Sequence, residues 1–160
     1  MNRAVVSAEL PGDALLERYR AEGGHVDCYV VEVPRSVDLR QLITAFYTST
    51  VFRPERWLLG ALLGKRANNA DVARLAAGET TRFSAWSVEA RGEDQILLCD
   101  FQGRTRSWLM VLPIEGGTRL HFGSAVIPQK RRADRALFSA LLGFHRLYSR
   151  VLLSGALKRL

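Results

Sequence analysis

The patterning of the chain changes at about residue 80, and this change constrains the fold more than any other feature. Short apolar stretches of alternating or β-branched character follow one another from there, separated by "RGED", a turn at Gly103 and "EGG". They predict four strands, at 80–91, 95–102, 104–113 and 117–127. Strands joined by turns this short form an antiparallel meander, so the second half of the chain is predicted to build one sheet.

One amphipathic helix follows the meander and closes the chain, "LFSALLGFHRLYSRVLLSGALKRL" at 137–160. At about 100° per residue, its large apolar side chains fall on one stripe, with Arg146 and Arg150 on the opposite side. The helix begins at about 132–134 and, at 1.5 Å per residue, is roughly 40 Å long. It is the only predicted element long enough to cover the sheet. The sequence therefore predicts an α+β fold, a curved antiparallel sheet wrapped around this helix with a pocket between them.

The first half of the chain reads as one strand among several helices. The strand is predicted at 26–33, where Pro34 ends it, and the helices at 12–22, at 36–49 with Ser36 as N-cap, from Pro54 onward, and from Asn68 or Asn69 to Gly78. No repeat or low-complexity linker divides the sequence. We therefore expect a single domain over 1–160, with 1–24 as an N-terminal helical extension.

Composition indicates a globular protein of the cytoplasm. Hydrophobic residues make up 48% of the 160 residues and charged residues 24%. The first 24 residues lack the apolar region of a signal peptide, and no stretch approaches the ~18 apolar residues of a membrane span. Cys28 and Cys99 lie in strand-like apolar runs and are predicted to be buried, reduced thiols. Since no Cys-x-x-Cys or paired-histidine spacing occurs, we expect neither a metal site nor a cofactor.

The net charge of +7 is concentrated in the last 60 residues, with 11 Lys and Arg against 2 Asp and Glu. Its densest cluster is "QKRRADR" at 129–135, which contains Lys130, Arg131, Arg132 and Arg135. Either this cluster is a solvated loop or it makes a weak contact with an anionic surface. No aromatic residue is interleaved with it, which makes a nucleic-acid partner improbable.

This order of elements resembles the START-like superfamily, also called SRPBCC, whose helix-grip fold is shared by the birch-pollen allergen, polyketide cyclases and lipid-transfer START domains. More narrowly, the chain is similar to an uncharacterised domain family within that superfamily. The stretches that carry the resemblance are "HVDCYVVEVP" (25–34), "FYTSTVFRPERWLLG" (46–60), "FSAWSVEAR" (83–91), "GRTRSWLMVLP" (103–113), "TRLHFGSAV" (118–126) and "GFHRLYSRVLL" (143–153). The resemblance implies a hydrophobic cavity under the C-terminal helix that binds apolar or amphipathic small molecules, and in some members catalyses cyclisation or dehydration.

His145 and Tyr148 are the candidate catalytic residues, because both lie on the apolar stripe of the closing helix, one turn apart. A neutral imidazole beside a phenol can orient a ligand carbonyl or exchange a proton with it. The alternative is that His145 is a hydrogen-bonded core residue. Both readings place it against the sheet.

The strands supply the other candidate ligand contacts. Alternation in 117–127 places Phe122 and Ser124 toward the helix and leaves His121 exposed on the opposite side. Trp86 is a candidate from 80–91. In 104–113 both faces are apolar, so Trp108 and Arg106 share a face that the pattern does not identify. An inward Arg106 needs a carboxylate such as Asp100 or a ligand acid, but we favour an outward, surface Arg106.

Three functions remain open. The first is a carrier or sensor of a small apolar or amphipathic ligand held by Trp86, Phe122 and Tyr148. The second is a cyclase or dehydratase with His145 as general acid/base and Tyr148 or Arg106 polarising a carbonyl. The third is an interaction protein with a filled core and a basic surface. No nucleophile elbow, phosphate loop or dinucleotide fingerprint occurs in the sequence.

Overall fold

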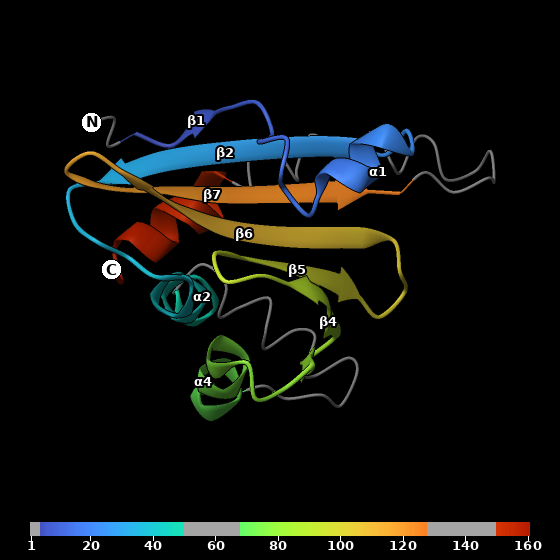
Figure 1. Ribbon diagram of the computed structural model, residues 1–160. Coiled ribbons are helices and arrows are strands. Elements are labelled where there is room, and N and C mark those ends of the chain that lie inside the picture. The colour runs from blue at the N-terminus through green and yellow to red at the C-terminus, as the bar shows by residue number, and fades with distance from the viewer. Residues whose placement is uncertain (1–3, 50–67, 128–149) are drawn as a thin grey trace.

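A seven-stranded antiparallel sheet forms the centre of the protein in the computed structural model, which describes residues 4–49, 68–127 and 150–160. The strand order is β1-β2-β7-β6-β5-β4-β3, and helices pack on the sheet (Figure 1). The predicted α+β class and antiparallel sheet are confirmed. The sequence predicts four or five strands, and two differences give seven. The edge strand β1 (Val6–Ser7) is too short to show a periodic pattern, and the single strand predicted at 80–91 is divided by a turn at 84–85, which makes β3 (Arg82–Phe83) a separate edge strand paired with the strand that follows it.

The long strands lie close to where the alternation places them. They are β2 (His25–Val33), β4 (Trp86–Arg91), β5 (Gln95–Asp100), β6 (Thr105–Ile114) and β7 (Gly117–Val126). The turn between β6 and β7 contains Gly116 at φ 74°, a backbone conformation that glycine adopts without strain. β2 then pairs with β7, so the strand that begins the sheet lies beside the strand that ends the meander.

Local capping chemistry sets the bounds of the helices. α2 (Leu39–Thr48) begins after Asp38, whose carboxylate accepts from the backbone N–H of Gln41 in a capping box, so the predicted Ser36 cap is wrong. α4 (Asn69–Ala77) has the predicted Asn68 cap and ends at Gly78 in the left-handed conformation. The helix predicted at 12–22 is only the short α1 (Glu17–Ala21).

Residues 150–157 form a C-terminal helical segment, in agreement with the end of the predicted closing helix. The earlier part of that helix, and the helix predicted from Pro54, lie outside the described residues.

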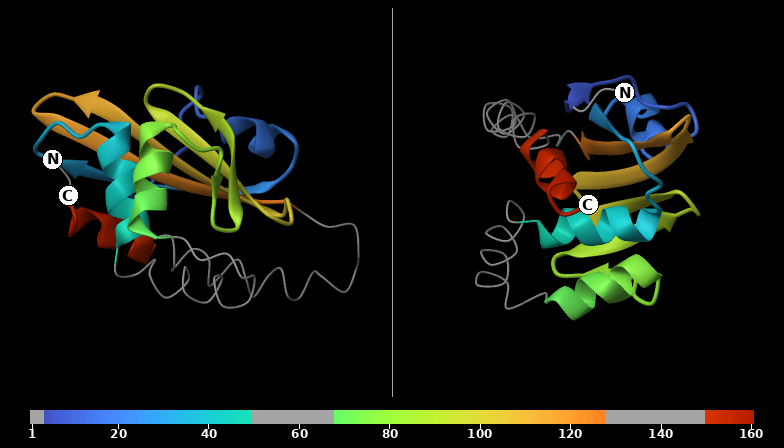
Figure 2. Two further views of the ribbon diagram at one scale, coloured as in Figure 1. Left: turned by 90° about the horizontal axis from the view of Figure 1, so that it is seen from below. Right: turned by 90° about the vertical axis from the view of Figure 1, so that its left-hand side faces the viewer.

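Three helical elements cover one face of the sheet, which we call the helix-covered face. α2 and α4 lie side by side across it, and the C-terminal segment packs at one end (Figure 2). Their buried side chains, including Leu42, Phe46, Leu75 and Leu153, form one core with those of β2, β5, β6 and β7. The expectation that the closing helix alone covers this face is therefore wrong.

The opposite face is also buried, which the sequence reading did not anticipate. The N-terminal segment, residues 8–21, lies across it and inserts Leu16 and Tyr19 against Cys28, Trp108 and Met110; we call this the strap-covered face. The continuous apolar run of β6 fits this arrangement, because a strand buried on both sides needs apolar residues at every position. The described chain thus has three layers.

Both cysteines are free thiols, as predicted. β7 and β6 separate the strands of Cys28 and Cys99, which places these residues roughly 14 Å apart at about 4.8 Å per strand, too far for a disulfide. Cys28 is buried, and desolvation together with the neighbouring Asp27 carboxylate raises the pKa of its thiol to about 12. Cys99 is half-buried, not fully buried as predicted.

Candidate ligand site on the helix-covered face

A row of polar residues crosses three neighbouring strands at one end of the helix-covered face. Asp27 of β2 lies opposite Ser124 of β7, and Ser124 lies opposite Ser107 of β6. Directly opposed residues of antiparallel strands share a face, so the three side chains lie on the same side of the sheet. The next row toward the core is apolar, with Phe122 opposite both Tyr29 and Leu109. The face is therefore amphipathic along its strands.

A short hydrogen bond fixes the Asp27 carboxylate in this polar row. Its Oδ1 accepts from the Ser124 hydroxyl at 2.5 Å and from the Ser124 backbone N–H at 3.1 Å. Ser124 is 2% exposed, so its only hydroxyl proton is committed to this bond in a shielded environment. Both the hydroxyl and the backbone N–H of Ser124 thus point to the Asp27 carboxylate.

Trp86 supplies a hydrogen-bond donor on the same face. Trp86 is in β4 and lies opposite Asp100 of β5. It is two residues along the strand from Val88, which lies opposite Leu98, and Leu98 in turn lies opposite Ser107 of the polar row. Its side chain packs against the core under the helices. Its indole Nε1 is buried and has no acceptor within the described part of the structure. A shielded N–H without an acceptor is costly, and an oxygen atom of a bound molecule would satisfy it.

The predicted ligand contacts divide between the two faces. Phe122, Ser124 and Trp86 share the helix-covered face, where the Phe122 ring lies 4.9 Å from that of Phe46. Trp108 points to the strap-covered face, where its Nε1 donates to Gln95 Oε1 at 2.9 Å. Arg106 has the same orientation, so neither residue lines a pocket with the other three.

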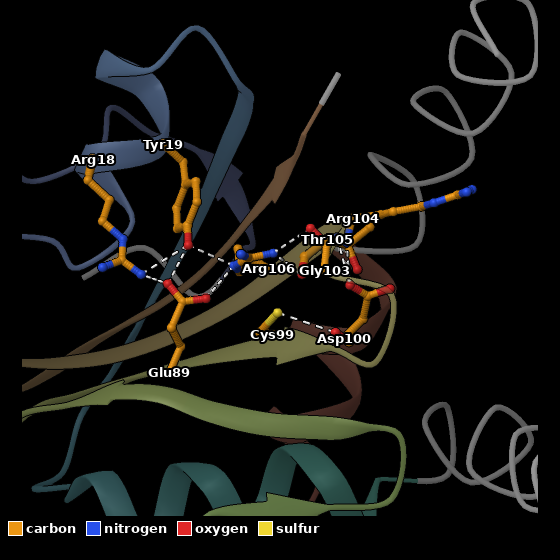
Figure 3. Close-up of polar contacts among 9 residues, drawn as sticks. All are labelled: Arg18, Tyr19, Glu89, Cys99, Asp100, Gly103, Arg104, Thr105 and Arg106. Atoms are coloured by element: carbon orange, nitrogen blue, oxygen red, sulfur yellow. Dashed lines mark hydrogen bonds and ion pairs between the residues drawn. The ribbon is translucent and has the colours of Figure 1, made fainter. Parts of the chain in front are cut away.

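Arg106 forms part of a partly buried ion-pair cluster (Figure 3). Its Nε lies 2.5 Å from Glu89 Oε2 and donates to the Tyr19 hydroxyl at 2.8 Å, while Arg18 pairs with the same carboxylate. Arg106 points away from the helices, as favoured, but it is not a surface arginine, because its side chain is only 12% exposed. Asp100 is not its partner either, because that carboxylate accepts from two backbone N–H groups of the β5–β6 turn.

Sequence alternation missed Glu89 because the β4 register shifts at a bulge between Val88 and Ala90. Val88 packs on the helix side and Ala90 on the strap side, and Glu89 reaches Tyr19 on the strap side as well. Period-2 reasoning cannot place a side chain across such a bulge.

His121 is buried, in contrast to the exposed position that the sequence predicts. It is 3% exposed on the strap-covered face, with its ring 5.9 Å from that of Trp108. Desolvation, with a smaller effect of the Arg119 charge, lowers the pKa of His121 to about 4. The prediction fails because the face away from the helices is covered by the N-terminal segment and does not face solvent.

The remaining predicted site residues lie outside the described residues. They are His145 and Tyr148, the candidate catalytic pair, and the basic cluster Lys130, Arg131, Arg132 and Arg135. Within the described residues, no group of three His, Cys, Asp or Glu side chains could hold a metal ion. No helix among them combines the length and the apolar character that a bilayer span requires.

Comparisons with protein-family models, with curated proteins and with solved structures found no match to this chain.

Proposed function

We propose that this chain is a START-like, helix-grip protein of the cytoplasm that carries or senses a small apolar or amphipathic molecule, bound between the sheet and the C-terminal helix. The antiparallel meander and the packing of the C-terminal segment on its face support the fold assignment. The amphipathic character of the helix-covered face supports the ligand class, because an apolar body fits against Phe122 and a polar group against the row of Asp27 and Ser124.

The observation that carries the proposal is the buried Trp86 Nε1, which has no acceptor among residues 4–49, 68–127 and 150–160. Native proteins seldom leave such a donor unpaired, because the lost hydrogen bond to water is not replaced. Trp108 provides the contrast, since its Nε1 is equally shielded and is paired with Gln95. We infer that a ligand oxygen is the missing partner of Trp86.

Binding of the neutral fluorescent probe N-phenyl-1-naphthylamine tests the presence of an apolar site. The wild-type protein should bind it, and an amphipathic alcohol with an oxygen that can accept from Trp86 should displace it. In Trp86→Phe the alcohol should displace the probe about 5–10-fold less effectively, which corresponds to one lost hydrogen bond of about 1–1.4 kcal/mol.

Trp108→Phe is the matched control, because it removes an indole on the other face and should leave the displacement unchanged. Absence of probe binding to the folded protein, or equal weakening in both variants, would refute the proposal. Mass spectrometry of the protein purified without denaturant should detect the natural ligand.

The cyclase or dehydratase alternative differs in its use of His145 and Tyr148. Turnover of a bound carbonyl compound that His145→Ala abolishes, with binding retained, would favour it. The interaction-protein alternative predicts no probe binding at all.

A further inference from the structure

A concave site lies on the outer side of α2, away from the sheet. It has a volume of about 510 Å³ and is formed between α2 and the C-terminal residues Arg159 and Leu160, which lie beside that helix (Figure 2). Residues at spacings of three and four, Gln41, Thr44 and Thr48, form its wall along α2. The volume is in the range of sites for small molecules.

Three guanidinium groups line this groove, from Arg35, Arg40 and Arg159. None of the three forms an ion pair with a carboxylate of the described residues. Other arginines of that part of the chain do form such pairs, namely Arg18, Arg20, Arg74, Arg106 and Arg119. The groove therefore concentrates positive charge that the protein does not neutralise there.

Arg35 and Arg40 lie on either side of the start of α2. Arg35 precedes the helix and Arg40 lies in its first turn, which contains no acidic residue. The Asp38 carboxylate caps this end of the helix and offsets part of the positive charge there. Among the described residues that line the groove itself, none is an Asp or Glu.

The uncharged groups of the groove indicate the rest of the ligand. Gln41 uses its Oε1 to accept from the Asp38 N–H, so its amide NH2 remains available as a donor. Thr44 and Thr48 donate their hydroxyl protons to backbone carbonyls one turn earlier. They consequently offer only acceptor oxygens, which suit the hydroxyl groups of a ligand and not its anionic group.

We propose that this groove binds a phosphate monoester carried on a small hydroxyl-bearing body. The guanidinium groups bind the phosphate oxygens, since the arginine fork matches phosphate geometry, and the threonine oxygens accept from the hydroxyls. Such a group occurs on free phosphorylated polyols and on the headgroups of phosphoinositides. The site is separate from the proposed ligand site, because the core residues of α2 point to the sheet and Gln41 and Thr44 are exposed.

Isothermal titration calorimetry with glycerol 3-phosphate at low salt, and sedimentation with phosphatidylcholine vesicles with or without phosphatidylinositol 4-phosphate, test the proposal. Binding in the first assay assigns a free metabolite, and binding only to the phosphoinositide vesicles assigns a lipid headgroup. In either assay Arg40→Gln should weaken binding at least tenfold, and binding should weaken as salt is raised.

The matched control is Arg82→Gln, which removes the same charge from an exposed position on β3 outside the groove. Equal weakening in this variant, or no binding of either ligand by the wild type, would overturn the proposal. Inorganic phosphate should bind more weakly than glycerol 3-phosphate; equal affinity would overturn the role of the threonines. The neutral probe does not report on this groove, so the two proposals fail independently.

Discussion

The polar side chains on the two faces of the sheet differ in their hydrogen-bond partners. On the strap-covered face, Gln95 joins Trp108 to the backbone of the N-terminal segment, and Glu89 joins Arg106 to Tyr19. On the helix-covered face, the Trp86 indole has no acceptor among the described residues, and the Asp27 carboxylate accepts from Ser124 of the polar row.

The difference follows from what covers each face. An irregular segment brings backbone N–H and C=O groups that lack partners, so the sheet beneath it must provide polar side chains. Helices satisfy their own backbone groups and need only an apolar surface. The fold thus requires the polar residues beneath the N-terminal segment but not those beneath the helices. Trp86, Asp27 and Ser124 are therefore the better candidates for function.

The largest expected effect comes from Gln95→Leu on the strap-covered face. Gln95 is 8% exposed, accepts from Leu15 N and Trp108 Nε1 at 2.9 Å each, and donates to Asp13 O at 3.2 Å. Leaving these groups without partners should lower the free energy of unfolding by roughly 3–5 kcal/mol, measured by urea denaturation. Ser107→Ala on the other face is the control and should cost less than about 0.5 kcal/mol. A loss below about 1 kcal/mol for Gln95→Leu would contradict a structural role.

His121 should make the strap-covered face sensitive to acid. The pKa of its imidazole is about 4 in the folded protein, so between pH 6.5 and 4 the unfolded chain binds a proton that the folded chain does not. Stability should therefore fall as the pH decreases through this range, by about 3 kcal/mol in total at about 1.4 kcal/mol per pH unit. His121→Leu should remove this part of the pH dependence in denaturation curves recorded at several pH values. Identical pH profiles for the two proteins would show that His121 is accessible in the native state.

Glu89→Gln should have an intermediate effect. The exposed fractions of the Glu89 and Arg106 side chains are 20% and 12%, so the variant leaves a shielded guanidinium without its carboxylate. We expect a loss of about 1–2 kcal/mol. The control is Glu32→Gln, whose partner Arg119 is 41% exposed and which should cost about 0.5 kcal/mol. If both variants cost the same in chemical denaturation, burial under the strap does not strengthen the pair.

Trp86→Phe should change stability least, because its indole N–H has no protein partner to lose among the described residues. We expect a change of about 0.5 kcal/mol, against about 1–2 kcal/mol for Trp108→Phe, which breaks the bond to Gln95. Thermal or urea denaturation of the ligand-free variants measures both. An equal loss of stability in the two variants would mean that the Trp86 N–H has a hydrogen-bond partner within the protein, as the Trp108 N–H has. A ligand oxygen would then not be needed there.

Much of the fold could be predicted because its signals are local. The strands from β4 to β7 follow from alternation and short turns, and α4 from the cap at Asn68 and the glycine at position 78. Phe122 and Ser124 lie on the helix-covered face, as predicted, because they alternate with His121 and Gly123 along β7. The missed site residue is Asp27, although its alternation with Tyr29 in a predicted strand was the available signal.

The sequence by itself determined the antiparallel meander, the cap of α4 and the amphipathic C-terminal segment, since these depend on interactions between residues a few positions apart. Only the tertiary structure decided which face each β6 residue occupies, that Glu89 and not Asp100 pairs with Arg106, and that His121 is buried. The physical reason is that a strand's period defines two faces without saying what covers them. That choice depends on where the N-terminal segment folds back, a contact between residues about 80 or more positions apart that no local pattern encodes.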